Sequence, residues 1–178
     1  MHQSKIALAA VAALALTACA QPAAKPAVDT AKIADAVKAD AEASVADLNA
    51  KNADKAASHD AANIVGMFHG TPNVNSPAKD LAMTKLQVAD PAFKLAISNE
   101  TVDVAQAGDM AVFRASYVAT MTDPKTKKPM TENGNWVVQY KAQTDGSWKM
   151  AISVVSDTGA APAAAAPAAA AAPASDKK

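Results

Sequence analysis

The first half of the chain spaces its apolar residues as helices do. Between positions 33 and 48 they recur every three or four residues, and charged residues occupy the other faces. This spacing predicts one amphipathic helix of about 18 to 20 residues. Asn52 can cap a short second helix over 53–59. Ser76 and Pro77 predict the start of a third helix, which ends before Asp90 because Pro91 follows.

The second half alternates between apolar and polar residues, as strands do. After a short strand candidate at 63–68, the alternation begins beyond Pro91 and slips around 98–101, which predicts a β-bulge. Long strands are expected over 110–122, 135–142 and 148–155, with a tight hairpin at 144–147. Helices followed by a meander of antiparallel strands predict an α+β fold with the helices on one sheet face.

The alternation also divides the three long strands into two faces. We assign the face with the large apolar and aromatic side chains to the core. Its members are Phe113, Tyr117, Met121, Trp136, Val138, Tyr140, Trp148, Met150, Ile152 and Val154. The opposite face is mixed and carries Val112, Val137, Ala151 and Val155. It could serve as a homodimer surface, or these side chains could be exposed singly.

The first 18 residues predict a signal peptide. Lys5 precedes an apolar stretch over residues 6–16, which is too short to span a membrane as a helix. The following Leu16-Thr17-Ala18-Cys19 resembles the lipobox of bacterial lipoproteins. The resemblance implies lipidation of Cys19 and stable membrane anchoring, and Ala20 after it implies an outer-membrane lipoprotein facing the periplasm. The alternative is a secreted protein in which Cys19 has this position by chance.

The same reading divides the chain into four segments. These are a signal peptide over 1–18, a proline-containing tether over 19–28, one folded domain over 29–158, and a disordered Ala/Pro-rich tail over 159–178.

Charge and cysteine content exclude several functions. The chain has 17 Lys+Arg and 17 Asp+Glu, so it lacks the overall positive charge that nucleic acid attracts. Its single cysteine excludes an intramolecular disulfide and a cysteine-based zinc site. No nucleotide-binding loop or metal-ligand spacing is present, so we expect no cofactor and no metal.

The folded middle resembles the SnoaL-like and ketosteroid-isomerase-like cone of the nuclear transport factor 2-like (NTF2-like) superfamily. The resemblance is carried by Asn52-Ala53-Asp54, by Gly108-Asp109-Met110-Ala111, and by the segments 131–138 and 145–149. It implies a single cone-shaped domain with the N-terminal helices on the concave face of a curved, mainly antiparallel sheet. It also implies a pocket between the two layers. This fold hosts isomerases, cyclases, dehydratases and non-catalytic binding modules.

We expect this pocket to bind a ligand without chemistry, because the core-facing set of the three long strands contains no Asp, Glu or His. The expected protein is a membrane-anchored envelope lipoprotein that binds a small apolar or amphipathic ligand, or a protein partner. The expected pocket residues are His59, Met67, Ile97, Tyr117, Trp136, Val138 and Ile152. One alternative is a lyase or isomerase that uses His59 and Tyr117. Another is an envelope assembly module that dimerises through the outer sheet face.

Overall fold

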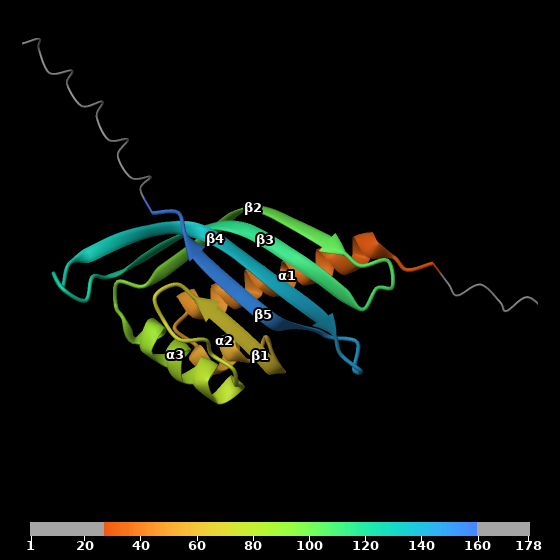
Figure 1. Cartoon of the computed structure of the whole chain (residues 1–178), viewed down its shortest axis with the longest axis horizontal. Helices are drawn as coiled ribbons and strands as arrows, with labels where there is room; N and C mark the ends of the chain where they lie inside the picture. Colours follow the sequence, from red (N-terminus) through yellow and green to blue (C-terminus); the bar gives the residue numbers. More distant parts are fainter. Residues whose placement is uncertain (1–26, 160–178) are drawn as a thin grey trace, which may run out of the picture.

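Three helices cover one face of a curved five-stranded sheet in the computed structural model (Figure 1). The structure describes residues 27–159, so the predicted signal peptide, Cys19 and almost all of the predicted tail lie outside the described residues. The predicted α+β architecture, with the N-terminal helices on the concave face, is confirmed. Within the described residues, no helix combines the length and the apolarity needed to cross a membrane.

Side-chain caps set the starts of the helices. Helix α1 (Thr30–Asn49) begins after Asp29, whose carboxylate accepts a hydrogen bond from the backbone N–H of Lys32 at 3.0 Å. Helix α2 (Ala53–Ala57) is capped in the same way by Asn52, as predicted, and is shorter than predicted because a strand begins at residue 60. Helix α3 (Pro77–Ala89) has its predicted start and end, with Ser76 as its cap.

The strands are β1 (Asp60–Phe68), β2 (Lys94–Val104), β3 (Met110–Thr122), β4 (Pro129–Ala142) and β5 (Trp148–Asp157). Their order in the sheet is β1-β5-β4-β3-β2, with β1 parallel to β5 and the other pairs antiparallel. The predicted bulge is present between Ser98 and Thr101, where Asn99 takes a left-handed backbone angle (φ 55°).

Strand β4 begins well before the predicted residue 135. Pro129 already pairs with Thr122, and the pairing with β3 continues without interruption to the end of the hairpin. Glu132 therefore belongs to the strand and shares the helix-facing side with Trp136, because side chains two residues apart point to the same face.

Strand β5 changes register against β4 at an irregularity between Gln139 and Tyr140. Beyond it, Ser153 pairs with Val138 and Val155 pairs with Trp136. Because paired residues lie on the same face, Ser153 and Val155 turn toward the helices.

The predictions that Ile152 and Val154 face the core and that Val155 faces outward are therefore wrong. Ile152 and Val154 pair with Gln139 and Val137 on the outer face. Since both are half-buried there, the outer face is more apolar than predicted.

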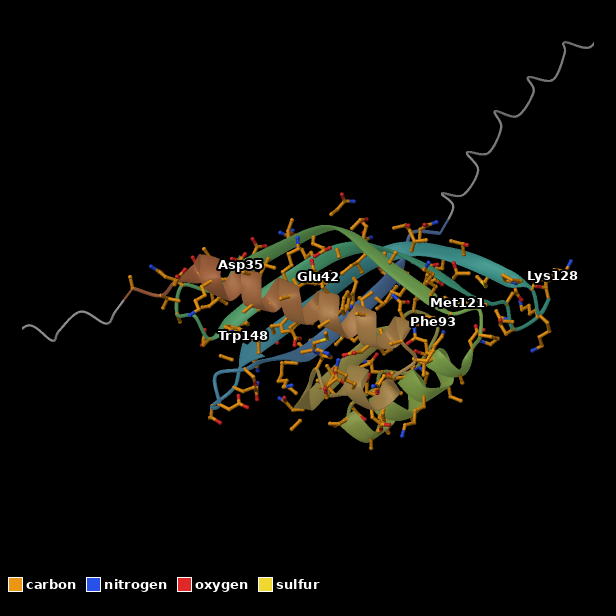
Figure 2. The ribbon with its side chains drawn as sticks, turned by 180° about the vertical axis from the view of Figure 1, so that it is seen from behind. Asp35, Glu42, Phe93, Met121, Lys128 and Trp148 are labelled. Carbon is orange, nitrogen blue, oxygen red and sulfur yellow. The ribbon has the colours of Figure 1, made fainter. Side chains whose placement is uncertain are left out.

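The core lies between α1 and the sheet. Figure 2 shows α1 lying across the sheet, with Asp35 and Glu42 labelled along the helix. Phe113 and Trp136 meet edge to face, with ring centroids 5.4 Å apart. The largest fully buried side chains are Val37, Ile64, Phe113, Val138 and Tyr140.

Candidate functional site

A cavity of about 430 Å³ lies between the helices and the concave face of the sheet. Its wall is mainly apolar, and exposed residues such as His69, Thr71 and Gln87 belong to it, so it opens to solvent on that side. The lining comes from all three helices and all five strands and consists of Ser44, Leu48, Ala56, Asp60, Phe68, His69, Thr71, Asp80, Met83, Thr84, Gln87, Leu95, Tyr117, Ala119, Met121, Glu132, Trp136, Met150, Ser153 and Val155.

Two of the seven expected pocket residues, Tyr117 and Trp136, line this cavity. The other five do not. Ile97 and Val138 pack in the hydrophobic core, Met67 is exposed, and Ile152 lies on the outer face. His59 pairs with Asp40 and Asp47 of α1 and is not part of the cavity lining.

One polar group in the cavity joins β3, β4 and the turn after β1. The Tyr117 hydroxyl donates a hydrogen bond to Glu132 Oε1 at 2.5 Å, and His69 Nε2 lies 3.2 Å from the same oxygen. Burial raises the pKa of Tyr117, and the adjacent Glu132 carboxylate raises it further. The tyrosine is therefore a hydrogen-bond donor at neutral pH.

Gly134 makes room for this arrangement. It is the β4 partner of Tyr117, and a Cβ atom at this position would overlap the tyrosine ring and the backbone oxygen of Ser156. Glycine therefore allows the ring to lie close to the strand.

The register change in β5 supplies another polar contact. Trp136 Nε1 donates a hydrogen bond to Ser153 Oγ at 2.9 Å, and both residues line the cavity. The indole N–H of this largely buried tryptophan is thereby satisfied.

A second polar group consists of two carboxyls. Asp60, the first residue of β1, has its Oδ2 buried without a hydrogen-bond partner among the described residues. Burial raises the pKa of Asp60 to about 8, and the neighbouring Asp80 carboxyl on α3 adds to the rise, whereas Lys149 opposes it. Asp60 is therefore mostly a neutral acid at pH 7. Asp80 accepts a long hydrogen bond, 3.4 Å, from the Thr84 hydroxyl.

These carboxyls correct the expectation of an acid-free pocket. Glu132 lies in the part of β4 that the alternation did not predict. Asp60 and Asp80 come from β1 and α3, which lie outside the three long strands on which the expectation was based. The absence of acids therefore no longer argues against chemistry in this cavity.

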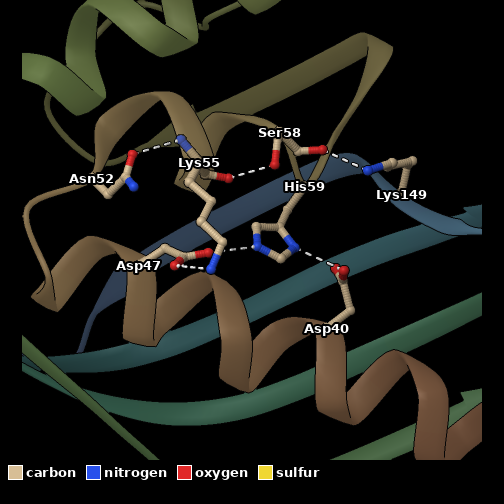
Figure 3. Close-up of polar contacts among 7 residues, drawn as sticks. All are labelled: Asp40, Asp47, Asn52, Lys55, Ser58, His59 and Lys149. Carbon is tan, nitrogen blue, oxygen red and sulfur yellow. Dashed lines mark hydrogen bonds and ion pairs between the residues drawn. The ribbon is translucent and has the colours of Figure 1, made fainter.

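His59 instead belongs to an ionic cluster between α1 and α2 (Figure 3). Its Nδ1 lies 2.7 Å from Asp40 Oδ1 and its Nε2 lies 3.2 Å from Asp47 Oδ2. Asp47 also accepts from Lys55 Nζ at 2.8 Å. The hydrogen bond to Asp40 raises the pKa of His59, partly opposed by burial and supported by Asp47. His59 and Tyr117 are thus in different clusters, and His59 connects the start of β1 to α1.

The described residues contain no group of three or more His, Cys, Asp or Glu side chains able to hold a metal ion. The same part of the chain therefore provides no ready-made metal site.

No family model matches the chain, and no curated protein matches it. Solved structures do match. A ketosteroid isomerase-like protein from Erwinia carotovora atroseptica is 16% identical with a TM-score of 0.60, over 71% of this chain and 96% of that chain. An NTF2-like protein with a cystatin-like fold from Novosphingobium aromaticivorans is 15% identical with a TM-score of 0.57, over 73% and 84%.

A hexachlorocyclohexane dehydrochlorinase, LinA type 2, is 11% identical with a TM-score of 0.62, over 70% of this chain and 84% of that chain. These similarities show that the described domain has the NTF2-like cone fold. At such low identity they show the fold alone, and proteins with this fold differ in activity.

Proposed function

We propose that the cavity binds one small ligand with a mainly apolar body. The supporting observation is the cavity itself, because about 430 Å³ of mainly apolar space with a few polar groups is typical of small-molecule sites. The wall carries two polar groups, Tyr117 with Glu132 and Asp60 with Asp80, which can orient a ligand.

Trp136 provides a direct test, because it lines the cavity and the chain has only two tryptophans. In a Trp148→Phe variant of the full chain, Trp136 is the only tryptophan. Titration with the uncharged apolar dye N-phenyl-1-naphthylamine should quench its emission with one saturable site. Unchanged Trp136 emission at saturating dye would count against the proposal.

A cavity-filling variant supplies the matched comparison. Ala119→Phe places a ring in the cavity and should abolish the saturable signal. Ala96→Phe adds the same ring at an exposed position of β2 and should leave the signal unchanged. Equal binding by both variants would place the dye elsewhere on the protein.

We further propose that the protein acts at a membrane to which Cys19 anchors it. The lipobox-like sequence supports this, since a lipidated cysteine with two or three acyl chains gives stable anchoring. Cys19→Ala should abolish both the processing of the chain and its partition into the membrane fraction. A Cys19→Ala chain of wild-type mass and wild-type partition would contradict the anchor.

Acid–base catalysis is a second candidate function, and the hydrogen-bonded group Tyr117–Glu132–His69 favours it. An enolisable ligand placed against this group would meet a phenol donor and an imidazole base. The dehydrochlorinase among the similar structures indicates that this fold can carry an enzyme.

The test is turnover of a Δ5-ketosteroid. If the second candidate holds, His69→Ala and Tyr117→Phe should each lower kcat at least about 100-fold. His59 lies outside the cavity lining. The kcat of His59→Ala, measured per folded molecule, should therefore equal that of the wild type. Absence of turnover with saturating ketosteroid would remove this substrate class and leave ligand binding in place.

A further inference from the structure

The cavity wall contains more acidic than basic side chains. Three carboxyl residues line it, Asp60, Asp80 and Glu132, and among the described lining residues there is no lysine or arginine. Among the lining residues that the structure describes, His69 is the one basic side chain, and it is already paired with Glu132. An apolar space with unbalanced acids attracts a cation, because a charge inside it is poorly screened by water.

The two acids at the α3 side have few partners of their own. Asp60 Oδ2 is buried and has no hydrogen-bond partner among the described residues, and Asp80, the carboxyl that faces it, accepts a long hydrogen bond from Thr84. Glu132 differs, since it is engaged by both Tyr117 and His69. A buried, unsatisfied carboxyl oxygen in a cavity wall is costly unless something binds to it.

The neighbours of Asp60 do not supply the missing cation. Asp80 faces it from α3 and Asp40 from α1. Tyr140 of β4 also lies near it, and its hydroxyl has no hydrogen-bond partner within residues 27–159. Lys149 of β5 is the nearby cation, and its ammonium donates to the backbone oxygen of Ser58 at 2.6 Å and does not line the cavity.

We propose that the ligand is an amphiphilic amine, whose ammonium binds between Asp60 and Asp80 while its apolar part fills the rest of the cavity. The inference rests on the proposed ligand-binding function and deepens it by naming the chemical class. An ammonium offers up to three N–H donors, which can satisfy Asp60 Oδ2 and Asp80 together.

Such binding releases a proton. Burial and Asp80 hold Asp60 largely protonated in the empty cavity at neutral pH, with a pKa of about 8. When an ammonium binds, the carboxyl gives its proton to solvent and remains as the carboxylate of an ion pair. The affinity for an amine should therefore rise with pH up to about 8 and then level off. A ligand that accepts a hydrogen bond from protonated Asp60 would show the opposite trend.

The experiment compares three probes with one apolar body: 1-adamantylmethylamine, 1-adamantylmethanol and 1-adamantanecarboxylate. Each is titrated by calorimetry into the full chain carrying Cys19→Ala, at pH 6, 7 and 8.5 and in buffers of different ionisation enthalpy. We expect the amine to bind at least about tenfold more tightly than the alcohol at pH 8.5 and the carboxylate to bind most weakly. Proton release should accompany amine binding at pH 6 and 7, where Asp60 is largely protonated in the empty cavity. The affinity for the amine should fall about tenfold per pH unit between pH 7 and 6.

Matched variants locate the effect. Asp60→Asn should remove the preference for the amine and leave the affinity for the alcohol unchanged, which also shows that the variant is folded. Asp80→Asn should weaken amine binding and move the pH midpoint of the remaining binding downward, since one cause of the raised pKa is lost. Asp35→Asn, the same change at an exposed position on α1, should change nothing.

The outcomes separate the two proposals. Equal affinity for amine and alcohol, or amine affinity that falls as pH rises, overturns the amine assignment while ligand binding stands. If none of the three probes binds at millimolar concentration and the naphthylamine dye also fails, the ligand-binding function itself is wrong.

Discussion

Asp60 is a carboxyl residue whose pKa is strongly raised by its surroundings. Its pKa is raised from 3.8 to about 8, so between these values the folded protein holds a proton that the unfolded chain has lost. Stability falls with rising pH wherever the folded state binds more protons, so this carboxyl lowers stability progressively from about pH 4 to 8. A group kept at such a cost at the wall of a cavity is a candidate for function.

Asp60→Asn should therefore stabilise the protein at pH 8.5, by about 1 kcal/mol or more, and have little effect at pH 4. Urea unfolding of both proteins at the two pH values measures the difference. If the difference in unfolding free energy between Asp60→Asn and the wild type is the same at both pH values, Asp60 ionises normally and its pKa is not raised.

His59 should give a different pH signature from the same experiment. Its pKa is raised above 6.5 by Asp40, so its stabilising contribution is complete below about pH 6.5 and is lost as pH rises through the folded-state value. His59→Gln should therefore cost more stability at pH 5.5 than at pH 9.5. Asp35→Asn, at an exposed position of α1, the helix that carries Asp40, serves as the control with no such difference. A His59→Gln penalty that does not change with pH would mean that no charged pair forms.

The residues of the site were only partly predictable. Tyr117 and Trp136 followed from the alternation alone, because both are large and lie on the face with the other aromatics. Glu132 escaped because its neighbours Thr131, Asn133 and Gly134 are typical of a loop, although its spacing from Trp136 places both on one face. Asp60 lies at a strand start beside a helix end, where periodicity carries no signal.

At the scale of elements, local chemistry fixed most boundaries. The caps Asn52 and Ser76 and the breaker Pro91 predicted where helices begin and end, and the slip in alternation predicted the β2 bulge. The irregularity in β5 was hidden for a physical reason. Beyond it, apolar residues occupy both faces of the strand. A register shift of one residue therefore still places apolar side chains against the core, and the sequence does not distinguish the two registers.

The β3–β4 pairing provides a sharp mutational test at this scale. Gly134→Ala should destabilise the protein by about 1–3 kcal/mol, because the added methyl group overlaps the Tyr117 ring and backbone atoms of β5. It should also weaken dye binding, since Tyr117 must move. Asn133 is the adjacent residue and is exposed, so Asn133→Ala should change the free energy of unfolding very little. Chemical denaturation measures both, and a neutral Gly134→Ala would contradict the packing described for the tyrosine.

At the scale of the whole molecule, the cavity lies away from the point where the chain enters the domain. The α1 residues that line it, Ser44 and Leu48, are about 21 Å and about 27 Å along the helix from Thr30, at 1.5 Å per residue. Figure 1 shows the start of α1 at the opposite end of the domain from α2 and α3. If Cys19 anchors the protein, we therefore expect a ligand to enter the cavity from the aqueous side.

The anchored protein and the Cys19→Ala chain should therefore bind 1-adamantylmethylamine with affinities within about twofold of each other. Equilibrium dialysis against vesicles carrying the lipidated protein, with empty vesicles to correct for partition, measures the first value. An affinity that depends strongly on the anchor would indicate that the ligand enters from the bilayer.

Native mass spectrometry of the delipidated protein, purified from its native source, shows whether the cavity holds a small molecule. We expect one bound molecule that carries an amine, present on the wild type and on Ala96→Phe and missing from Ala119→Phe. If the wild-type protein is detected at the mass of the ligand-free chain and binds none of the added adamantyl probes, the cavity does not hold a small molecule.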